Sequence, residues 1–205
     1  MTRIVAGAAG GRRLAVPPRG TRPTSERVRE ALFNALEAAM ELDGAAVLDL
    51  YAGSGALGLE ARSRGAARVV CVESDRKAAE VLRRNVSSVG LGGVTVRAGK
   101  VRTVLQAGAD EPFDVVIADP PYALETGELA AVLRDLAGGG WTRPGTTVVI
   151  EREKRDGEID WPAPFQPVRT RTYGQTVLHW GLHEMGLARD GPTRAGGDVN
   201  PSRIG

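Results

Sequence analysis

Asp119, Pro120, Pro121 and Tyr122 follow one another at the end of an apolar run, and they form the stretch of this chain best suited to bind an amine. The two prolines fix two φ angles and remove two backbone donors, so Asp119 and the Pro120 carbonyl present hydrogen-bond acceptors in a fixed geometry. Acceptors beside a flat ring suit a planar group that carries an amine. The alternative is a proline turn that only ends a strand.

The elements around this stretch alternate between strand and helix patterns. The β-branched run that precedes Asp119 predicts a central parallel strand buried on both faces. Repeated strand–helix units with short links predict an α/β fold with a mostly parallel sheet and helices on both faces. We expect strands over 46–50, 68–72, 94–97, 113–118 and 146–151, and helices over 55–64, 75–88, 101–105 and 129–136. After prolines that exclude a regular element over 162–167, residues 168–173 and 175–181 predict an antiparallel hairpin that closes the sheet.

The ends of the chain differ from its middle. Residues 1–22 predict a small basic arm or hairpin with few core-forming residues, residues 23–185 the main domain, and residues 186–205 a disordered tail. Seven arginines stand against one acid between Arg3 and Arg29, which predicts a phosphate-binding surface, although a solvated arm gives the same pattern. A helix begins near Ser25, and we expect Arg27 and Arg29 on its exposed side. We therefore expect the arm to serve contact more than stability.

Composition narrows the class of protein. The chain has 205 residues, a net charge of +2 and a single cysteine, Cys71, so it has no internal disulfide, and a reducing compartment is its natural setting. It contains no apolar stretch of membrane-spanning length and no signal-peptide core, which predicts a cytoplasmic protein. His179 and His183 lack partners at metal-ligand spacing, so we expect no metal. Trp141, Trp161 and Trp180 are expected to be packing residues.

A glycine motif follows the first predicted strand. Gly53, Gly55 and Gly58 satisfy G-x-G-x-x-G, and Glu73 stands ~20 residues further on, as in a dinucleotide-binding fingerprint. Asp49 argues against a dinucleotide, because a carboxylate facing a pyrophosphate in a partly buried crevice is unfavourable. S-adenosylmethionine carries positive charge and no phosphate, so it fits better, and Glu73 suits its ribose diol. The competing role for Asp49 is the capping of a neighbouring helix.

These motifs together resemble a known family. D-x-x-A-G-x-G at 49–55, the acid after the second strand and D-P-P-Y at 119–122 are similar to the S-adenosylmethionine-dependent methyltransferases of the class I, seven-stranded Rossmann-like type that methylate exocyclic amines. R-I-V-A-G at 3–7, G-R-R-L at 11–14, R-P-T-S-E-R-V-R-E-A-L-F-N-A-L at 22–36 and D-L-Y-A-G-S-G-A-L-G-L-E-A at 49–61 resemble, more closely, the bacterial guanine-N2 methyltransferases of 16S ribosomal RNA. The resemblance spans residues 3 to about 181 in several ordered motifs.

The resemblance implies a function and its residues. A methyl group passes from S-adenosylmethionine, leaving S-adenosylhomocysteine, to the N2 amine of a guanine in 16S ribosomal RNA, within a small-subunit particle, by a monomer that needs no metal. The Asp119 side chain and the Pro120 carbonyl accept the amine hydrogens, and Tyr122 stacks on the base. The implied residues are, for catalysis, Asp119, Pro120, Pro121 and Tyr122; for the cofactor, Asp49, Tyr51, Ala52, Gly53, Ser54, Gly55, Glu73 and Ser74; and for RNA, Arg3, Arg12, Arg13, Arg22, Arg27 and Arg29.

Other functions stay open at the level of sequence. A DNA adenine or a protein glutamine presents an amine to a similar clamp, an NAD-dependent oxidoreductase fits the glycine motif alone, and a non-catalytic RNA-binding module fits the arm. One departure from the family pattern also matters. Many such methyltransferases carry an acid or amide after the third strand for the cofactor adenine, whereas here the segment is Ala98-Gly99-Lys100, so no residue is assigned to that contact.

Overall fold

The structure is a computed structural model that describes residues 1–17, 25–121 and 123–184. Its elements run in the order β1 (Thr2–Arg3), β2 (Arg13–Leu14), α1 (Glu26–Glu37), β3 (Ala46–Leu50), α2 (Ala56–Ser63), β4 (Arg68–Glu73), α3 (Arg76–Val89), β5 (Val94–Ala98), α4 (Val101–Gln106), β6 (Phe113–Ala118), α5 (Thr126–Gly138), β7 (Thr142–Glu153), the 3₁₀ turn η1 (Lys154–Asp156), β8 (Phe165–Tyr173) and β9 (Thr176–His183).

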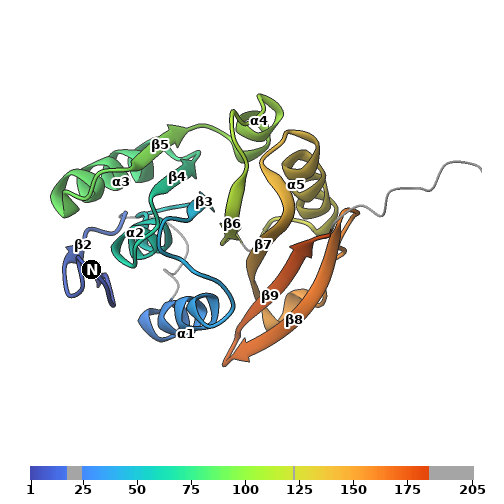
Figure 1. Cartoon of the computed structure of the whole chain (residues 1–205), viewed down its shortest axis with the longest axis horizontal. Coiled ribbons are helices and arrows are strands. Elements are labelled where there is room, and N and C mark those ends of the chain that lie inside the picture. The colour runs from blue at the N-terminus through green and yellow to red at the C-terminus, as the bar shows by residue number, and fades with distance from the viewer. Residues whose placement is uncertain (18–24, 122, 185–205) are drawn as a thin grey trace, which may run out of the picture.

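In the described part of the chain, seven strands form the main sheet in the order β5-β4-β3-β6-β7-β9-β8 (Figure 1). The strands from β5 to β7 are parallel, whereas β9 runs antiparallel to β7 and β8 antiparallel to β9. This confirms the predicted α/β fold with a C-terminal antiparallel hairpin. The order is that of the seven-stranded Rossmann-like sheet that the sequence resemblance implied.

The helices cover both faces of the sheet, because the central strands are apolar on both sides. Helices α1, α2 and α3 pack on one face against residues such as Val47 and Ile117, and α4 and α5 pack on the other against residues such as Leu48 and Val116 (Figure 1). Alternate residues of the same strand thus belong to different cores. The two cores hold the central strands rigidly, and with them the loops that leave the strand ends.

The strand order has its switch point between β3 and β6. The chain runs from β3 outward to β4 and β5 and then returns to the other side of β3 as β6, so the connections diverge there. In parallel α/β sheets, ligands bind beyond the carboxyl ends of the strands at such a switch point. The segments after Leu50 and after Ala118 leave the sheet at this point, and they carry the glycine motif and Asp119.

The starts of two strands differ most from the prediction. β7 begins at Thr142 instead of 146, because Pro144 and Gly145 lie in a bulge opposite Phe113, where the hydroxyl of Thr146 donates to the Phe113 carbonyl at 2.6 Å. β8 begins at Phe165 and includes Pro167, which was predicted to exclude a regular element. Proline is tolerated there because β8 is an edge strand and its register shifts after Pro167.

The N-terminal arm is packed more firmly than predicted. β1 and β2 form a two-stranded antiparallel hairpin, and its apolar residues Ile4 and Leu14 are 1% and 0% exposed in a small core with Leu59 of α2 and Val89 of α3. The expectation that the arm adds little to stability is therefore wrong for residues 2–15. Among the described residues, no helix is both long and apolar enough to cross a membrane.

Candidate active site

Asp49 lies beneath the glycine loop at the carboxyl end of β3. Its Oδ2 accepts a hydrogen bond from the Gly58 amide at 2.8 Å, in the first turn of α2, while Oδ1 is buried without a hydrogen-bond partner among the described residues. Burial raises the pKa of Asp49 from 3.8 to about 7, and the nearby Glu73 carboxylate adds to this effect. Asp49 therefore does not line the crevice as predicted. It caps α2 from inside and leaves one acceptor oxygen under the loop.

The three glycines of the motif lie in different surroundings, so a side chain would be excluded or tolerated at each for a different reason. At Gly53, with φ of 54°, an added Cβ would meet nothing within 4 Å, so the space beside it is open. At Gly55, with φ of 81°, a Cβ would lie 2.1 Å from a terminal carbon of Leu82 in α3, so a side chain here would be strained and would have to displace Leu82. At Gly58, a Cβ would lie 2.6 Å from the Cys71 sulfur and 3.0 Å from Asp49 Oδ2. The last two glycines let helices lie close to the loop and sheet.

Glu73 ends β4 and binds the glycine loop directly. Its Oε2 accepts from the Gly53 amide at 2.8 Å and its Oε1 from the Asp75 amide at 2.7 Å. The Ala52 amide, one residue before Gly53, donates to the Val72 carbonyl at 3.0 Å. Ser74, which follows Glu73, is exposed. The loop and the end of β4 therefore form one hydrogen-bonded unit around the open space at Gly53.

Tyr51 opens the glycine loop in an unusual conformation. Its φ is 62°, a left-handed value that costs a non-glycine residue ~1–3 kcal/mol and persists only where the surroundings impose it. Its ring is partly buried against the core under α4 and α5. Burial raises the pKa of its phenol to about 12, so the hydroxyl stays protonated. Strain of this kind is typical of a functional loop.

The Asp119 loop leaves β6 beside the glycine loop. The Asp119 amide donates to the Leu50 carbonyl at 3.3 Å, Pro120 is buried, and the Pro121 carbonyl accepts from the Leu124 amide at 2.9 Å in a turn. Within the described residues the Pro120 carbonyl accepts no hydrogen bond. Tyr122 lies outside the described residues. The structure thus brings the Asp119 acceptors and the glycine loop together at adjacent strand ends, as an amine clamp beside a cofactor loop requires.

Arg152 was not predicted as part of the site, but it holds the Asp119 loop from β7. Its guanidinium donates to the Leu124 carbonyl at 3.0 Å and pairs with Asp156 at 3.2 Å, and the residue is 8% exposed. A charge at an inward position of a strand is the sequence signal that could have identified it, because such residues are rarely buried without a partner.

Comparison with known proteins agrees with this geometry. A family described as conserved hypothetical protein 95 matches residues 2–181. Ribosomal RNA small subunit methyltransferase D of Escherichia coli K12 is 37% identical over 176 residues, which is 85% of this chain and 86% of that protein. The chain belongs to this family of small-subunit ribosomal RNA methyltransferases.

Solved structures agree with the family assignment. A candidate methyltransferase from Escherichia coli superposes with a TM-score of 0.79 at 34% identity, over 89% of this chain and 97% of that one. An RNA methyltransferase from Salinibacter ruber, solved with S-adenosylhomocysteine, has a TM-score of 0.62 at 22% identity, over 82% of this chain and 98% of that one, a likeness of fold alone.

The arginines predicted to bind RNA occupy two kinds of environment in this methyltransferase. Arg3, Arg12, Arg13 and Arg27 are exposed. Arg3 pairs with Glu26 at 3.0 Å, and Arg12 donates to the Val89 carbonyl at the end of α3 at 2.7 Å. Arg22 lies outside the described residues.

Arg29 is the exception and corrects the prediction of an exposed side chain. It is 0% exposed and lies 3.6 Å from the carboxylate of Glu60, which is also 0% exposed, and it donates to the Arg3 carbonyl. Burial lowers the pKa of Arg29, and Glu60 opposes that shift. Arg29 belongs to the buried stripe of α1 with Leu32 and Phe33, three and four residues further on, and this spacing could have been recognised in the sequence.

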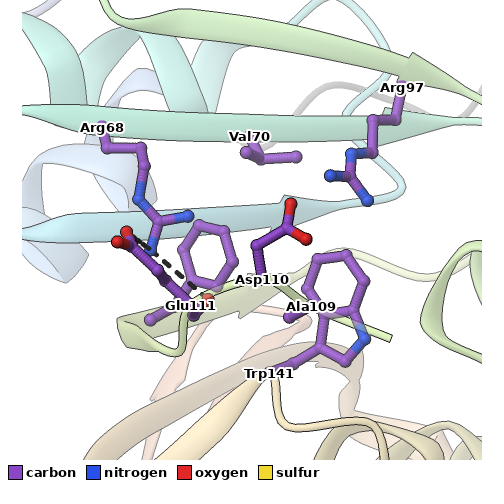
Figure 2. A pocket seen from close by; sticks show the side chains of 8 residues that line it. Arg68, Val70, Arg97, Ala109, Asp110, Glu111 and Trp141 are labelled. Atoms are coloured by element: carbon purple, nitrogen blue, oxygen red, sulfur yellow. Dashed lines mark hydrogen bonds and ion pairs between the residues drawn. The ribbon is translucent and has the colours of Figure 1, made fainter. Parts of the chain in front are cut away.

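A cavity of about 330 Å³ is lined by aromatic and charged side chains, most of which Figure 2 labels. The rings of Phe113 and Trp141 stack with centroids 5.9 Å apart, with Arg68 4.0 Å from the Phe113 centroid and Arg97 5.3 Å from the Trp141 centroid. Arg68 and Phe113 are the first residues of β4 and β6. The cavity therefore lies toward the opposite end of these strands from Asp119 and is not part of the methyltransferase site.

Proposed function

We propose that this protein transfers a methyl group from S-adenosylmethionine to the exocyclic N2 amine of a guanine in 16S ribosomal RNA. The observation that carries the proposal is the backbone hydrogen bond between Asp119 and Leu50, which joins the amine clamp to the cofactor loop at the switch point of the sheet. The family membership supports the same substrate class.

The residues around the glycine loop fit the cofactor. The space at Gly53 is open, and Glu73 presents a carboxylate beside it, which suits a ribose diol and opposes a pyrophosphate. We propose that the cofactor lies against residues 51–55 and is held by Glu73 and the adjoining Ser74. When bound, S-adenosylmethionine supplies the electrophilic methyl group. The solved Salinibacter ruber relative, with S-adenosylhomocysteine, shares this fold.

The Asp119 loop supplies the activation of the amine. An exocyclic amine is a poor nucleophile while its lone pair is delocalised into the ring. Two acceptors, the Asp119 carboxylate and the Pro120 carbonyl, would hold its two hydrogens and favour a tetrahedral nitrogen, and Asp119 is placed to receive the departing proton. The Pro121 carbonyl and the Arg152 guanidinium both bind the backbone of Leu124, which fixes the loop after the clamp. Tyr122 is proposed to stack on the guanine, worth ~1–3 kcal/mol.

RNA contact is proposed for the exposed residues Arg3, Arg12, Arg13 and Arg27, and for Arg22, which lies outside the described residues. We further propose that residues 23–185 form the catalytic domain, that the substrate is RNA within a small-subunit particle in the cytoplasm, and that the protein acts as a monomer. The β1–β2 hairpin carries several of these arginines and is packed against α2 and α3, which favours an ordered contact surface.

The experiment is methyl transfer from labelled S-adenosylmethionine to 16S RNA and to small subunits from a strain that lacks the enzyme, followed by mass mapping of the nucleotide. Asp119→Asn should lower kcat by about 10²-fold or more and leave S-adenosylhomocysteine affinity unchanged, because it removes the proton acceptor and not the cofactor loop. Asp110→Asn is the matched control, since Asp110 is an exposed acid of the remote cavity. Label on an adenine or on protein, or an active Asp119→Asn enzyme, would reject the proposal.

A further inference from the structure

We infer that Asn85 of α3 is a positioning residue that couples the cofactor loop to the N-terminal arm, an inference that rests on the proposed function. Its side chain is 3% exposed and hydrogen-bonds to both segments. Nδ2 donates to the Ser54 carbonyl at 2.8 Å and to the Ala15 carbonyl at 2.9 Å, while Oδ1 accepts from the Ala15 amide at 2.9 Å. One planar amide therefore fixes the loop and the arm together.

The loop side of this contact concerns the cofactor. Ser54 stands between Gly53 and Gly55, both at positive φ, at the centre of the loop proposed to hold S-adenosylmethionine. A ligand that fixes this loop fixes the Ser54 carbonyl, and with it the orientation of the Asn85 amide. Because the Asn85 side chain is planar and buried, its Oδ1 then keeps its position toward Ala15.

The arm side of the contact concerns RNA. Ala15 follows directly after β2, two residues from Arg13, which is exposed and proposed to bind phosphate. Arg12 adds a second attachment to α3, through the Val89 carbonyl. Coupling of binding free energies is reciprocal, so RNA held at the arm should tighten the cofactor as much as the cofactor orders the arm.

The arm has another anchor that does not touch the cofactor loop. The Ala9 amide donates to the hydroxyl of Ser63 at 2.9 Å, at the far end of α2 from the glycine motif. Ala9 and Ala15 thus belong to the same arm, each held by a side chain of the domain, but only the Ala15 anchor also holds the loop. The pair forms an internal control.

Amide hydrogen exchange of the whole protein, with and without S-adenosylhomocysteine, tests the inference. Bound S-adenosylhomocysteine should slow exchange of the Ala15 amide by about 5-fold or more, the lower limit of typical couplings, and leave that of Ala9 unchanged. If S-adenosylhomocysteine binds and Ala15 is unaffected, or if both amides slow equally, the coupling is rejected and the proposed function stands. If S-adenosylhomocysteine does not bind, both the coupling and the proposed function are rejected.

Asn85→Asp removes the link to the loop and keeps one hydrogen bond to the arm. The aspartate keeps an acceptor for the Ala15 amide but has no donor for the Ser54 and Ala15 carbonyls, so the ligand effect on exchange of the Ala15 amide should disappear while that amide keeps its hydrogen bond. Ser63→Ala is the control, and it should loosen Ala9 and leave the ligand effect at Ala15 intact. Should Asn85→Asp fail to fold, Ala15→Pro removes the amide donor at an exposed residue, and it should weaken S-adenosylhomocysteine binding several-fold. A ligand effect that survives Asn85→Asp, or unchanged affinity in Ala15→Pro, contradicts the inference.

Discussion

Replacing Arg29 by methionine should destabilise the protein, whereas the same change at Arg27, two residues earlier on α1, should not. Arg29 and Glu60 are both 0% exposed, and breaking such a buried pair typically costs about 3–5 kcal/mol. Glu60 would keep Arg64 at 2.8 Å and the Val5 amide at 2.7 Å, so part of its charge stays compensated. We therefore expect a loss near the lower limit, about 3 kcal/mol.

The assay is equilibrium unfolding by denaturant, with RNA binding measured on the same two variants across salt concentrations. Arg27→Met should unfold like the parent protein but bind RNA with a salt slope lower by about one unit, because Arg27 is exposed and free to meet phosphate. Arg29→Met, under conditions where it is folded, should keep the parent slope.

The reverse pattern would refute the reasoning. If Arg29→Met unfolds at the parent midpoint, or if it lowers the salt slope as much as Arg27→Met, then Arg29 is not a buried structural charge. A further variant, Arg29→Met with Glu60→Leu, should not restore stability, because Glu60 also accepts the amides of Val5 and Ala6, which would then be left unpaired.

Two other predictions concern charge. The pKa of Asp49 is raised from 3.8 to about 7 in the folded protein, so between these pH values the folded state binds a proton that the unfolded chain has released. The free energy of unfolding without cofactor should therefore fall as pH rises through this window. Asp49→Asn should remove that fall in unfolding curves taken from pH 4 to pH 8. An equal fall in the variant would show that Asp49 is not responsible. Arg13→Ala should weaken RNA binding about uniformly across sequences and lower the salt slope by roughly one unit in filter-binding measurements, whereas an unchanged slope would exclude a phosphate contact at this residue.

The pattern of residues predicts the strands of this protein well where hydrophobic runs are uninterrupted. The bounds of β3 and β6 agree with the prediction, because their β-branched and apolar residues are bounded by clear breaks in pattern. The limits of β7 and β8 were missed, because a bulge and an edge position let Pro144 and Pro167 occur within strands. Whether a proline fits within a strand depends on the neighbouring strands, and the local sequence does not show which strands these are.

The sequence predicted where candidate side chains lie better than how they pack. Asp119 and Glu73 lie at strand ends as predicted, because acids at such positions stand out in a parallel α/β pattern. The packing of Leu82 beside Gly55 could not be predicted, because Leu82 lies on another helix. Asn85 was not found at all, since its partners Ser54 and Ala15 are 31 and 70 residues away. Long-range hydrogen bonds of single side chains leave no periodic signal.

The packing of the arm also sets the order in which this protein can fold during its synthesis. Residues 2–15 are synthesised before the groups that hold them, in Glu60, Ser63 and Asn85, which come 54 to 70 residues later. At ~5–20 residues per second, these partners are added several seconds after the arm itself. The β1–β2 hairpin can therefore dock only after α2 and α3 have been synthesised, and the proposed RNA-contacting surface is completed only after the cofactor loop has been made.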